Sequence, residues 1–304
     1  MNNHLLQGSR RTSGEQAPTE WINLDGTSQE DLDWLDRGAN LDRSNARLLL
    51  NTLPHSRCVH TDAGIFVALV RPDGARSDGQ QDLNVWLEPR RVITVFRGAG
   101  SVVAEVAARV DQGSERGDCL SLLATLTVTL VRPLENDIAE LAEEVDDLED
   151  RVLDSDGPEL LNTVADARRR ALAVRRRLNS MRDILSTLTF KPELFPRDLG
   201  LDSLRRAVDY LGHLVGQVDA TRDRLILLFD QLSAREQHRI NKAMQKLAVV
   251  GTVFLPLTFV TGLLGINVAG IPDAHDPMAF WLVCLFLVAI VITAFAIIKW
   301  KKWI

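Results

Sequence analysis

Residues 247–267 read LAVVGTVFLPLTFVTGLLGIN, and residues 278–298 read MAFWLVCLFLVAIVITAFAII. The apolar parts of these stretches, 247–264 and 278–298, are each close to the roughly 20 residues that cross a hydrocarbon core of about 30 Å. Two buried core helices of a soluble protein fit these lengths poorly. The sequence therefore predicts two transmembrane helices joined by a short outer loop at residues 265–277.

Basic residues flank the pair of predicted spans on one side only. Three precede the first span, and three follow the second in a basic tail at residues 299–304: Arg239, Lys242, Lys246, Lys299, Lys301 and Lys302. The link between the spans contains no Lys or Arg. Because positive charge is enriched on the cytoplasmic side, we expect both termini in the cytoplasm, the link in the periplasm and a basic ring at the inner face.

Small and polar residues recur along one face of the first span. They are spaced by alternating threes and fours: Asn241, Met244, Ala248, Gly251, Leu255, Thr258 and Gly262. Pro256 also frees the carbonyl of Thr252, which must then be buried in protein or face water. Such a face suits either a packing seam between two copies or the wall of an aqueous path. Two helices cannot enclose a path, so the sequence favours a pore made by several copies of the first span.

The rest of the chain shows little sign of other chemistry. The 304 residues carry a net charge of −6, which disfavours nucleic acid as a partner. Cys58, Cys119 and Cys284 are scattered and predict neither a disulfide framework nor a zinc finger. We interpret His55 and His60 as structural. Because no nucleophile, metal triad or phosphate loop occurs in residues 20–132, we expect no enzyme activity and no cofactor.

The predicted organisation is a cytoplasmic α/β domain followed by helices. Residues 1–19 are expected to form a disordered tail, and residues 20–132 a mixed α/β domain. Its strands are predicted at 21–25, 59–60, 65–70, 83–87 and 92–96, and its helices after Ser28 and at 101–110 and 119–131.

Two helical regions follow the α/β domain. Residues 133–195 predict a self-paired hairpin of one acidic and one basic helix, with salt bridges favoured over metal binding as the role of the acids. Residues 196–246 predict a stalk helix that continues into the first span without a strong breaker before Pro256. A helix from residue 202 to residue 264 would be about 95 Å long.

The long stalk helix, the run Phe254-Leu255-Pro256-Leu257-Thr258-Phe259, the Gly265-Ile266-Asn267 turn and the terminal Lys-Trp-Lys-Lys-Trp together resemble the CorA-type metal ion transporter superfamily. The signature of that family is Gly-Met-Asn at the outer end of the first span. The run at residues 265–272 is similar to the zinc-transporting ZntB branch. This chain departs from the family pattern at Ile266, at Leu264, where many magnesium transporters have Tyr, and at Ala269, where the zinc branch commonly has Gly.

The resemblance implies a funnel-shaped homopentamer in the inner membrane with one axial pore. Asn267 would form a ring of amide oxygens at the outer mouth, together with backbone carbonyls of Gly265 and Ile266, and would hold a hydrated dication. Leu255, Met244 and Leu247 would form apolar gates. The resemblance also implies polar rings at Thr258 and Asn241 and a regulatory metal at Asp230.

Three functions stay open at this point. The first is a pentameric Zn²⁺ transporter with modest discrimination against Cd²⁺, Ni²⁺, Co²⁺ and Mg²⁺. The expected pore lacks Cys and His, and His275 in the outer loop is interpreted as solvated. The second is a Mg²⁺/Co²⁺ channel on the same scaffold. The third is a membrane-anchored coiled-coil scaffold without transport, which the polar face and the Gly-Ile-Asn turn disfavour.

Overall fold

The computed structural model describes ten segments of the chain: residues 2–6, 19–26, 28–37, 39–70, 82–97, 102–112, 118–154, 158–190, 200–265 and 277–300. The chain divides into two compact units, Met1–Phe229 and Asp230–Ile304, and each is described by itself.

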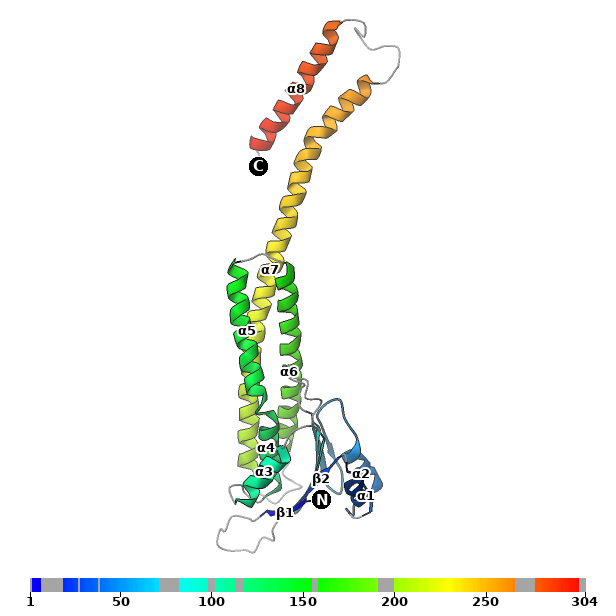
Figure 1. The fold of residues 1–304 in the computed structure, drawn as a ribbon, viewed down its shortest axis with the longest axis vertical. Coiled ribbons are helices and arrows are strands. Elements are labelled where there is room, and N and C mark those ends of the chain that lie inside the picture. Colours follow the sequence, from blue (N-terminus) through cyan, green and yellow to red (C-terminus); the bar gives the residue numbers. More distant parts are fainter. Residues whose placement is uncertain are drawn as a thin grey trace. The chain divides into compact units, whose positions relative to one another are not determined.

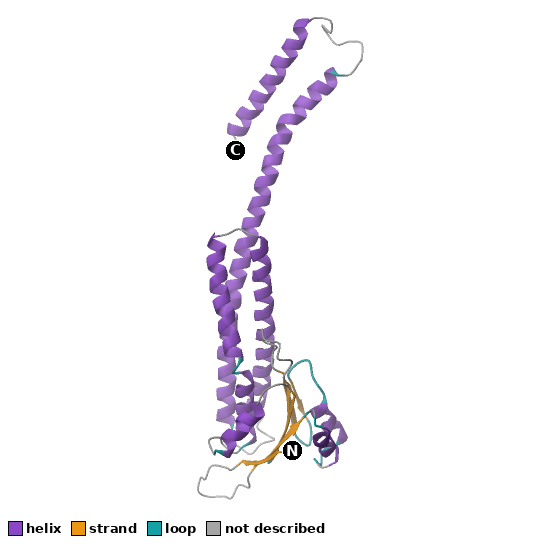
Figure 2. Cartoon of the chain, viewed as in Figure 1, coloured by secondary structure: helices purple, strands orange, loops and turns teal. Residues whose placement is uncertain are grey.

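The first unit is built on a six-stranded sheet (Figure 2). Its strands are β1 (Asn2–Leu6), β2 (Thr19–Asp25), β3 (Arg57–His60), β4 (Ile65–Val70), β5 (Asp82–Glu88) and β6 (Arg91–Arg97). The strand order is β1-β2-β6-β5-β4-β3. The β2–β6 pairing is parallel and the other four are antiparallel. The strands β4 and β5 are buried almost throughout, as expected for central strands covered on both faces.

Helices cover the two faces of this sheet (Figure 1). The helices α1 (Gln29–Arg37) and α2 (Arg43–Leu50) pack on one face around Trp86 and Phe66, both fully buried. The other face carries α4 (Cys119–Val131) and part of α6 (Pro158–Phe190), and α3 (Val102–Asp111) packs against α4 and β1. The apolar core of the α/β domain is therefore split into two layers by the sheet.

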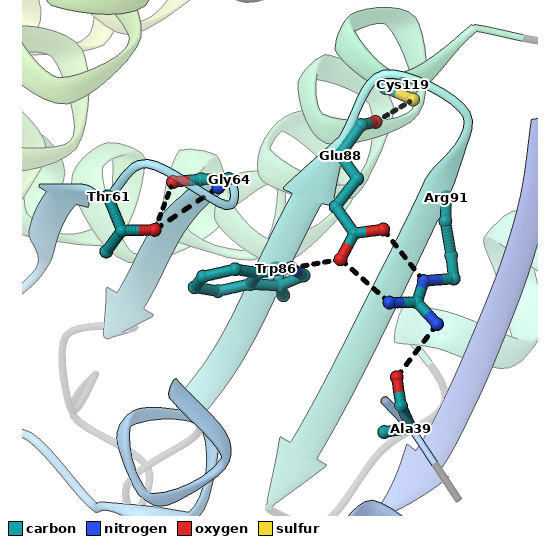
Figure 3. A network of polar contacts seen from close by, with 7 residues as sticks. All are labelled: Ala39, Thr61, Gly64, Trp86, Glu88, Arg91 and Cys119. Atoms are coloured by element: carbon teal, nitrogen blue, oxygen red, sulfur yellow. Dashed lines mark hydrogen bonds and ion pairs between the residues drawn. The ribbon is translucent and has the colours of Figure 1, made fainter. Parts of the chain in front are cut away.

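A charged network fixes the turn between β5 and β6 (Figure 3). The Glu88 carboxylate accepts hydrogen bonds from Trp86 Nε1 at 2.8 Å and from Arg91 Nε at 3.0 Å and Nη2 at 2.8 Å. Arg91 Nη1 also donates to the Ala39 carbonyl at 2.8 Å. The thiol of Cys119 donates to the Glu88 carbonyl at 3.1 Å, and burial raises the pKa of this thiol to about 12. Cys119 is thus a structural residue that joins α4 to the turn.

The helices α5 (Leu134–Asp154), α6 and the first part of α7 (Leu201–Leu264) form a three-helix bundle in the first unit. The predicted heptad face of α5 is buried throughout: Ile138, Leu141, Val145, Leu148 and Val152. Arg170 of α6 pairs with Glu144 of α5, which confirms salt bridges within the hairpin. Acids and bases also pair across to α7, because Arg175 bonds Asp219 and Arg224 bonds both Asp146 and Glu149. The prediction of a self-paired hairpin was incomplete in this respect.

The N-terminal segment differs from the sequence-based expectation. We expected residues 1–19 to be a disordered tail, but residues 2–6 form β1, antiparallel to β2, and Thr19 begins β2. Edge pairing is a backbone interaction, so a polar composition does not exclude it. Residues 7–18 lie outside the described residues.

The second unit contains the rest of α7 and α8 (Pro277–Trp300). Burial along α7 stops at Leu232, and after it no position is buried and most are exposed in the single chain. The last nine turns of α7 are therefore not part of an apolar core formed by the described residues.

Candidate functional site

The apolar ends of α7 and α8 are not buried in the protein. Both helices contain an 18-residue window apolar enough to cross a membrane, with mean hydropathy 2.2 in α7 and 2.9 in α8, and none of either window is buried. A core helix of a soluble protein with this composition would be covered by other parts of the chain. The exposure therefore favours a lipid environment for both helices.

One face of α7 carries the residues predicted to line a pore, and it is called the α7 stripe below. Its members are Asn241, Met244, Leu247, Ala248, Gly251, Leu255, Thr258 and Gly262, and all are exposed in the single chain. The exposed fraction is 63% for Met244, 72% for Leu247 and 74% for Leu255. A methyl group added at Gly251 or Gly262 would meet no atom within 4 Å. A single copy therefore leaves the whole stripe uncovered.

The hydroxyl groups of the span donate to their own helix. Thr258 Oγ1 donates to the Phe254 carbonyl at 2.8 Å, and Thr261 Oγ1 donates to the Leu257 carbonyl at 2.9 Å. The hydroxyl proton is thereby used, while the oxygen lone pairs remain able to accept a hydrogen bond. On the stripe, Thr258 therefore presents an acceptor to whatever lies beside it.

An amide pair extends the stripe toward its N-terminal end. Gln237 Nε2 donates to Asn241 Oδ1 at 3.2 Å, one helical turn apart. This contact uses one lone pair of the Asn241 amide oxygen. Gln237 was not among the predicted stripe residues, although the alternation of threes and fours continues from Asn241 back to residue 237.

An apolar groove of about 360 Å³ runs along α8 in the second unit. Thr252 lines it from α7, and the α8 residues are Phe286, Ala289, Ile290, Thr293, Ala294 and Ile297. Both threonine hydroxyls donate to carbonyls of their own helices, at 2.8 Å from Thr252 to Ala248 and 2.7 Å from Thr293 to Ala289. Thr252 borders the stripe, about 40° around the helix from Ala248. Thr252 lines the groove but none of the stripe residues does, and the stripe stays exposed in the single chain.

At the C-terminal end, Gly265 closes α7. Its N–H donates to the Thr261 carbonyl at 3.0 Å. An added Cβ would lie 3.2 Å from the same carbonyl oxygen, so a side chain here would press on the helix end. Ile266 and Asn267, expected at the selectivity mouth, and His275 lie outside the described residues.

The remaining predicted site residues lie apart from the stripe or outside the described part. Asp230 is exposed on α7, and Lys299 is exposed near the end of α8. Lys301 and Lys302 lie outside the described residues. Within the described segments, no three His, Cys, Asp or Glu side chains gather in a way that could hold a metal ion. The site that the structure presents is thus an uncharged stripe of amides, hydroxyls and apolar side chains.

Comparisons with known proteins point to one family. The profile of the family described as "CorA-like Mg2+ transporter protein" matches residues 17–300. The zinc transport protein ZntB of Pectobacterium carotovorum is 26% identical over 287 residues, covering 93% of this chain and 88% of that protein. The divalent cation transporter CmaX of Pseudomonas aeruginosa is 28% identical over 290 residues, covering 93% and 87%.

Solved structures agree with this assignment. The full-length CmaX structure superposes with a TM-score of 0.70 at 27% identity, covering 100% of this chain and 98% of that one. The CorA magnesium transporter of Methanocaldococcus jannaschii superposes with a TM-score of 0.71 at 19% identity, which supports the fold alone. The family consists of membrane transporters rather than enzymes. With its two apolar helices, its long α7 and its uncharged stripe, the chain belongs to the CorA-like Mg²⁺ transporter family and is a divalent cation transporter.

Proposed function

We propose that the protein carries hydrated divalent cations, Zn²⁺ in preference to Mg²⁺, across the cytoplasmic membrane through a pore on the axis of a homopentamer. The observation that carries the proposal is the α7 stripe, which is uncharged, exposed and built from small, amide, hydroxyl and apolar side chains. The number of subunits and the axial pore follow from the resemblance to CorA-type transporters, whose relatives include a zinc transport protein and a divalent cation transporter.

Assembly follows from the cost of leaving the stripe in lipid. Amide groups such as that of Asn241 are unfavourable against hydrocarbon unless they find polar partners or water. One copy contains α7 and α8 alone in its second unit, and two helices cannot surround water. Several copies arranged with their stripes inward would shield these groups from lipid and enclose a path. The small side chains at Gly251 and Gly262 would leave room along it.

The chemistry of the stripe suits an ion that keeps its water shell. Zn²⁺ bound directly by protein normally uses His, Cys or carboxylate ligands, and none of these belongs to the stripe. Thr258 and the Asn267 amide oxygens can instead accept hydrogen bonds from the water around a dication. Discrimination would then depend on hydration, so the preference for Zn²⁺ over Mg²⁺ would be modest.

Charge supports an orientation with both termini in the cytoplasm. Arg239, Lys242 and Lys246 are exposed on α7 just before its apolar window, and Lys299 is exposed at the end of α8. Arg239 also pairs with Glu236 at 3.2 Å, while Lys242 and Lys246 lie on the face of α7 opposite the stripe. Basic residues at the cytoplasmic ends of both spans agree with the positive-inside rule.

Flux measurement in proteoliposomes tests the transport proposal. Purified protein is reconstituted, and entry of Zn²⁺ and Mg²⁺ is followed with ion-specific dyes sealed inside. We expect both ions to enter, Zn²⁺ faster. Asn267→Ala should reduce both fluxes at least tenfold, because Ala removes every side-chain acceptor at the mouth at once, and tenfold corresponds to about 1.4 kcal/mol. Mg²⁺ flux without Zn²⁺ flux in the parent protein would move the assignment to the magnesium/cobalt branch.

A double variant separates hydrated from directly ligated transport. Cys284→Ser combined with His275→Ala removes the soft ligands nearest to the expected path and should leave Zn²⁺ flux nearly unchanged. Loss of Zn²⁺ flux with Mg²⁺ flux retained would show that direct ligands operate. The mass of the protein in detergent tests the assembly, and we expect five copies. A conducting monomer or dimer would contradict the axial pore.

A further inference from the structure

Two metal-binding side chains lie together on the edge strand β3, far along the chain from the proposed pore. Cys58 and His60 are two residues apart, and their Sγ and Nδ1 atoms are 3.9 Å from each other. Residues at i and i+2 of a strand point to the same face. We interpreted His60 as structural because the sequence shows no partner at metal-ligand spacing, but the extended backbone places the Cys58 thiol beside the imidazole.

The pair lies on the outer part of the sheet face that carries α6. The intervening residue Val59 packs into the core cluster under α1 and α2, so Cys58 and His60 point to the opposite face. Across the strand pair they stand beside Val67 and Ile65 of β4. His60 is exposed and Cys58 is partly covered, so solvent reaches the pair.

Neighbouring hydrogen bonds hold this strand in place. Ser180 Oγ of α6 donates to the Ser56 carbonyl at 3.2 Å, and the Val70 N–H donates to Ser56 Oγ at 3.0 Å. The start of β3 is thereby tied both to α6 and to the end of β4. The two ligand side chains consequently sit on a backbone that is already ordered.

The spacing of the two donor atoms suits a tetrahedral metal ion. With bonds of about 2.3 Å to sulfur and about 2.05 Å to nitrogen, the two donors of a tetrahedral Zn²⁺ lie about 3.5 Å apart. The observed 3.9 Å differs by a few tenths of an ångström, which small side-chain rotations supply. Thiolate and imidazole together favour Zn²⁺ and Cd²⁺ over Mg²⁺.

We propose that Cys58 and His60 form a binding site for one soft divalent cation, Zn²⁺ or Cd²⁺, on the edge of the α/β domain. Binding replaces the thiol proton with the metal, and water completes the coordination. With two protein ligands the site is weaker and more readily exchanged than a structural four-ligand zinc site. It does not depend on the selectivity or direction of the proposed transport.

The other two cysteines make the test specific. Cys119 is buried, its thiol donates to the Glu88 carbonyl, and its pKa is raised to about 12, so it remains a poorly reactive thiol. Cys284 lies in the apolar part of α8. A water-soluble alkylating reagent therefore reports on Cys58.

The experiment measures alkylation of Cys58 by iodoacetamide in the full chain in detergent, with the labelled peptide quantified by mass spectrometry. At Zn²⁺ concentrations ten times the dissociation constant, about one site in eleven is unoccupied, so labelling should slow about tenfold. Mg²⁺ at the same concentration should have no effect. Titration with Cd²⁺ should produce the ultraviolet absorption of a Cd²⁺–thiolate bond, and Cys58→Ser should abolish it.

Two histidine variants decide whether the imidazole is a ligand. His60→Ala keeps the thiol but should remove most of the Zn²⁺ protection. His213→Ala is the matched control, because His213 is an exposed histidine on α7 whose Nε2 lies 3.2 Å from Gln217. Zn²⁺ should protect Cys58 from alkylation in the His213→Ala variant as well as it does in the parent protein. Labelling that Zn²⁺ does not slow, or protection that survives His60→Ala, would overturn the site and leave only a thiol–imidazole hydrogen bond. Neither result bears on ion flux, which tests the pore separately.

Discussion

Gly200 begins α7 at the point where this helix meets the start of α4. Its φ is +73°, and its carbonyl accepts the first backbone bond of α7, from the Leu204 N–H at 3.0 Å. An added Cβ would collide with Asp118 Oδ1, the oxygen that caps α4 by accepting from the Ser121 N–H at 2.7 Å. Ser121 Oγ in turn bonds Ser203 Oγ at 3.1 Å. One glycine thus allows two helix starts to share a single polar joint.

Gly200→Ala should destabilise the first unit, because residue 200 has a left-handed backbone conformation and the added methyl group would clash with Asp118, the cap of α4. We expect the free energy of unfolding to fall by about 1–3 kcal/mol, which circular dichroism would detect as a lower thermal midpoint. Gly216→Ala is the control in the same helix. Gly216 has nothing within 4 Å of its added Cβ, and Ala is the better helix former by about 1 kcal/mol, so its midpoint should rise. Equal shifts in both variants would remove the special role of Gly200.

Leu255 is the exposed apolar residue of the stripe nearest to the kink-prone Pro256. In the proposed pore its copies would form a constriction that dewets and blocks ions. Leu255→Ala should therefore raise the basal Zn²⁺ flux into proteoliposomes several-fold. Phe254→Ala removes a side chain of similar exposure on a neighbouring face and should leave the flux unchanged. The apolar gate lies elsewhere if the two variants conduct alike.

At the scale of elements, sequence patterns predicted most of the α/β domain, and β4 and α4 have the predicted bounds. Both are strongly apolar and are bounded by turn or cap residues, so local signals suffice. The strand β1 was missed because its pairing depends on the edge of β2, a distant partner that composition does not reveal. The Cys58–His60 pair was missed because the predicted strand began at residue 59, whereas β3 begins at Arg57 and so brings Cys58 and His60 to one face.

The ion pairs between α5 and α7 could not be predicted from the sequence either. Helical spacing shows which side chains share a charged face, but it does not show which neighbouring helix that face contacts. Arg224 donates to Glu149 Oε1 from Nε at 2.8 Å and to Oε2 from Nη2 at 2.7 Å, and it also bonds Asp146. The hydrogen bond from Arg224 lowers the pKa of Glu149. These side chains are more than a third exposed, so solvent screens the pair and its contribution is at most about 1 kcal/mol.

The pH dependence of this contribution has a definite sign. A carboxyl whose pKa is lowered by folding stabilises the protein above its unfolded pKa of about 4.3 and loses that effect as pH falls through the folded value. At pH 7, a double-mutant cycle with Arg224→Met and Glu149→Gln should show a coupling free energy between the two side chains. Each kcal/mol of coupling corresponds to about 2–4 °C in the thermal midpoint. The coupling should vanish well below pH 4. The same cycle on Arg169 and Asp166, a more exposed pair within α6, should show a smaller coupling free energy. Coupling that persists in acid would mean that the pair does not act through ionised Glu149.

At the scale of the whole molecule, the stripe on α7 was predictable from its spacing of threes and fours, whereas its surroundings were not. Sequence spacing cannot show whether α8 covers the stripe, whereas in the structure no stripe residue lines the groove along α8. In the proposed assembly, other copies of the chain determine what faces the stripe in the membrane. The central claim is therefore that the stripe faces water in the assembled protein, while the adjacent faces of α7 do not.

Cysteine accessibility along α7 tests that claim most directly. Thr258→Cys and Thr261→Cys are made with Cys58→Ser and Cys284→Ser, while buried Cys119 is kept. The two threonines make the same kind of bond to their own helix, but Thr261 lies about 60° from Thr258 and off the stripe. Zn²⁺ flux is measured before and after a small cationic methanethiosulfonate reagent. We expect the reagent to block flux through the Thr258→Cys protein and to spare the Thr261→Cys protein. Block of the Thr261→Cys protein alone, or of neither, would contradict a pore lined by the α7 stripe.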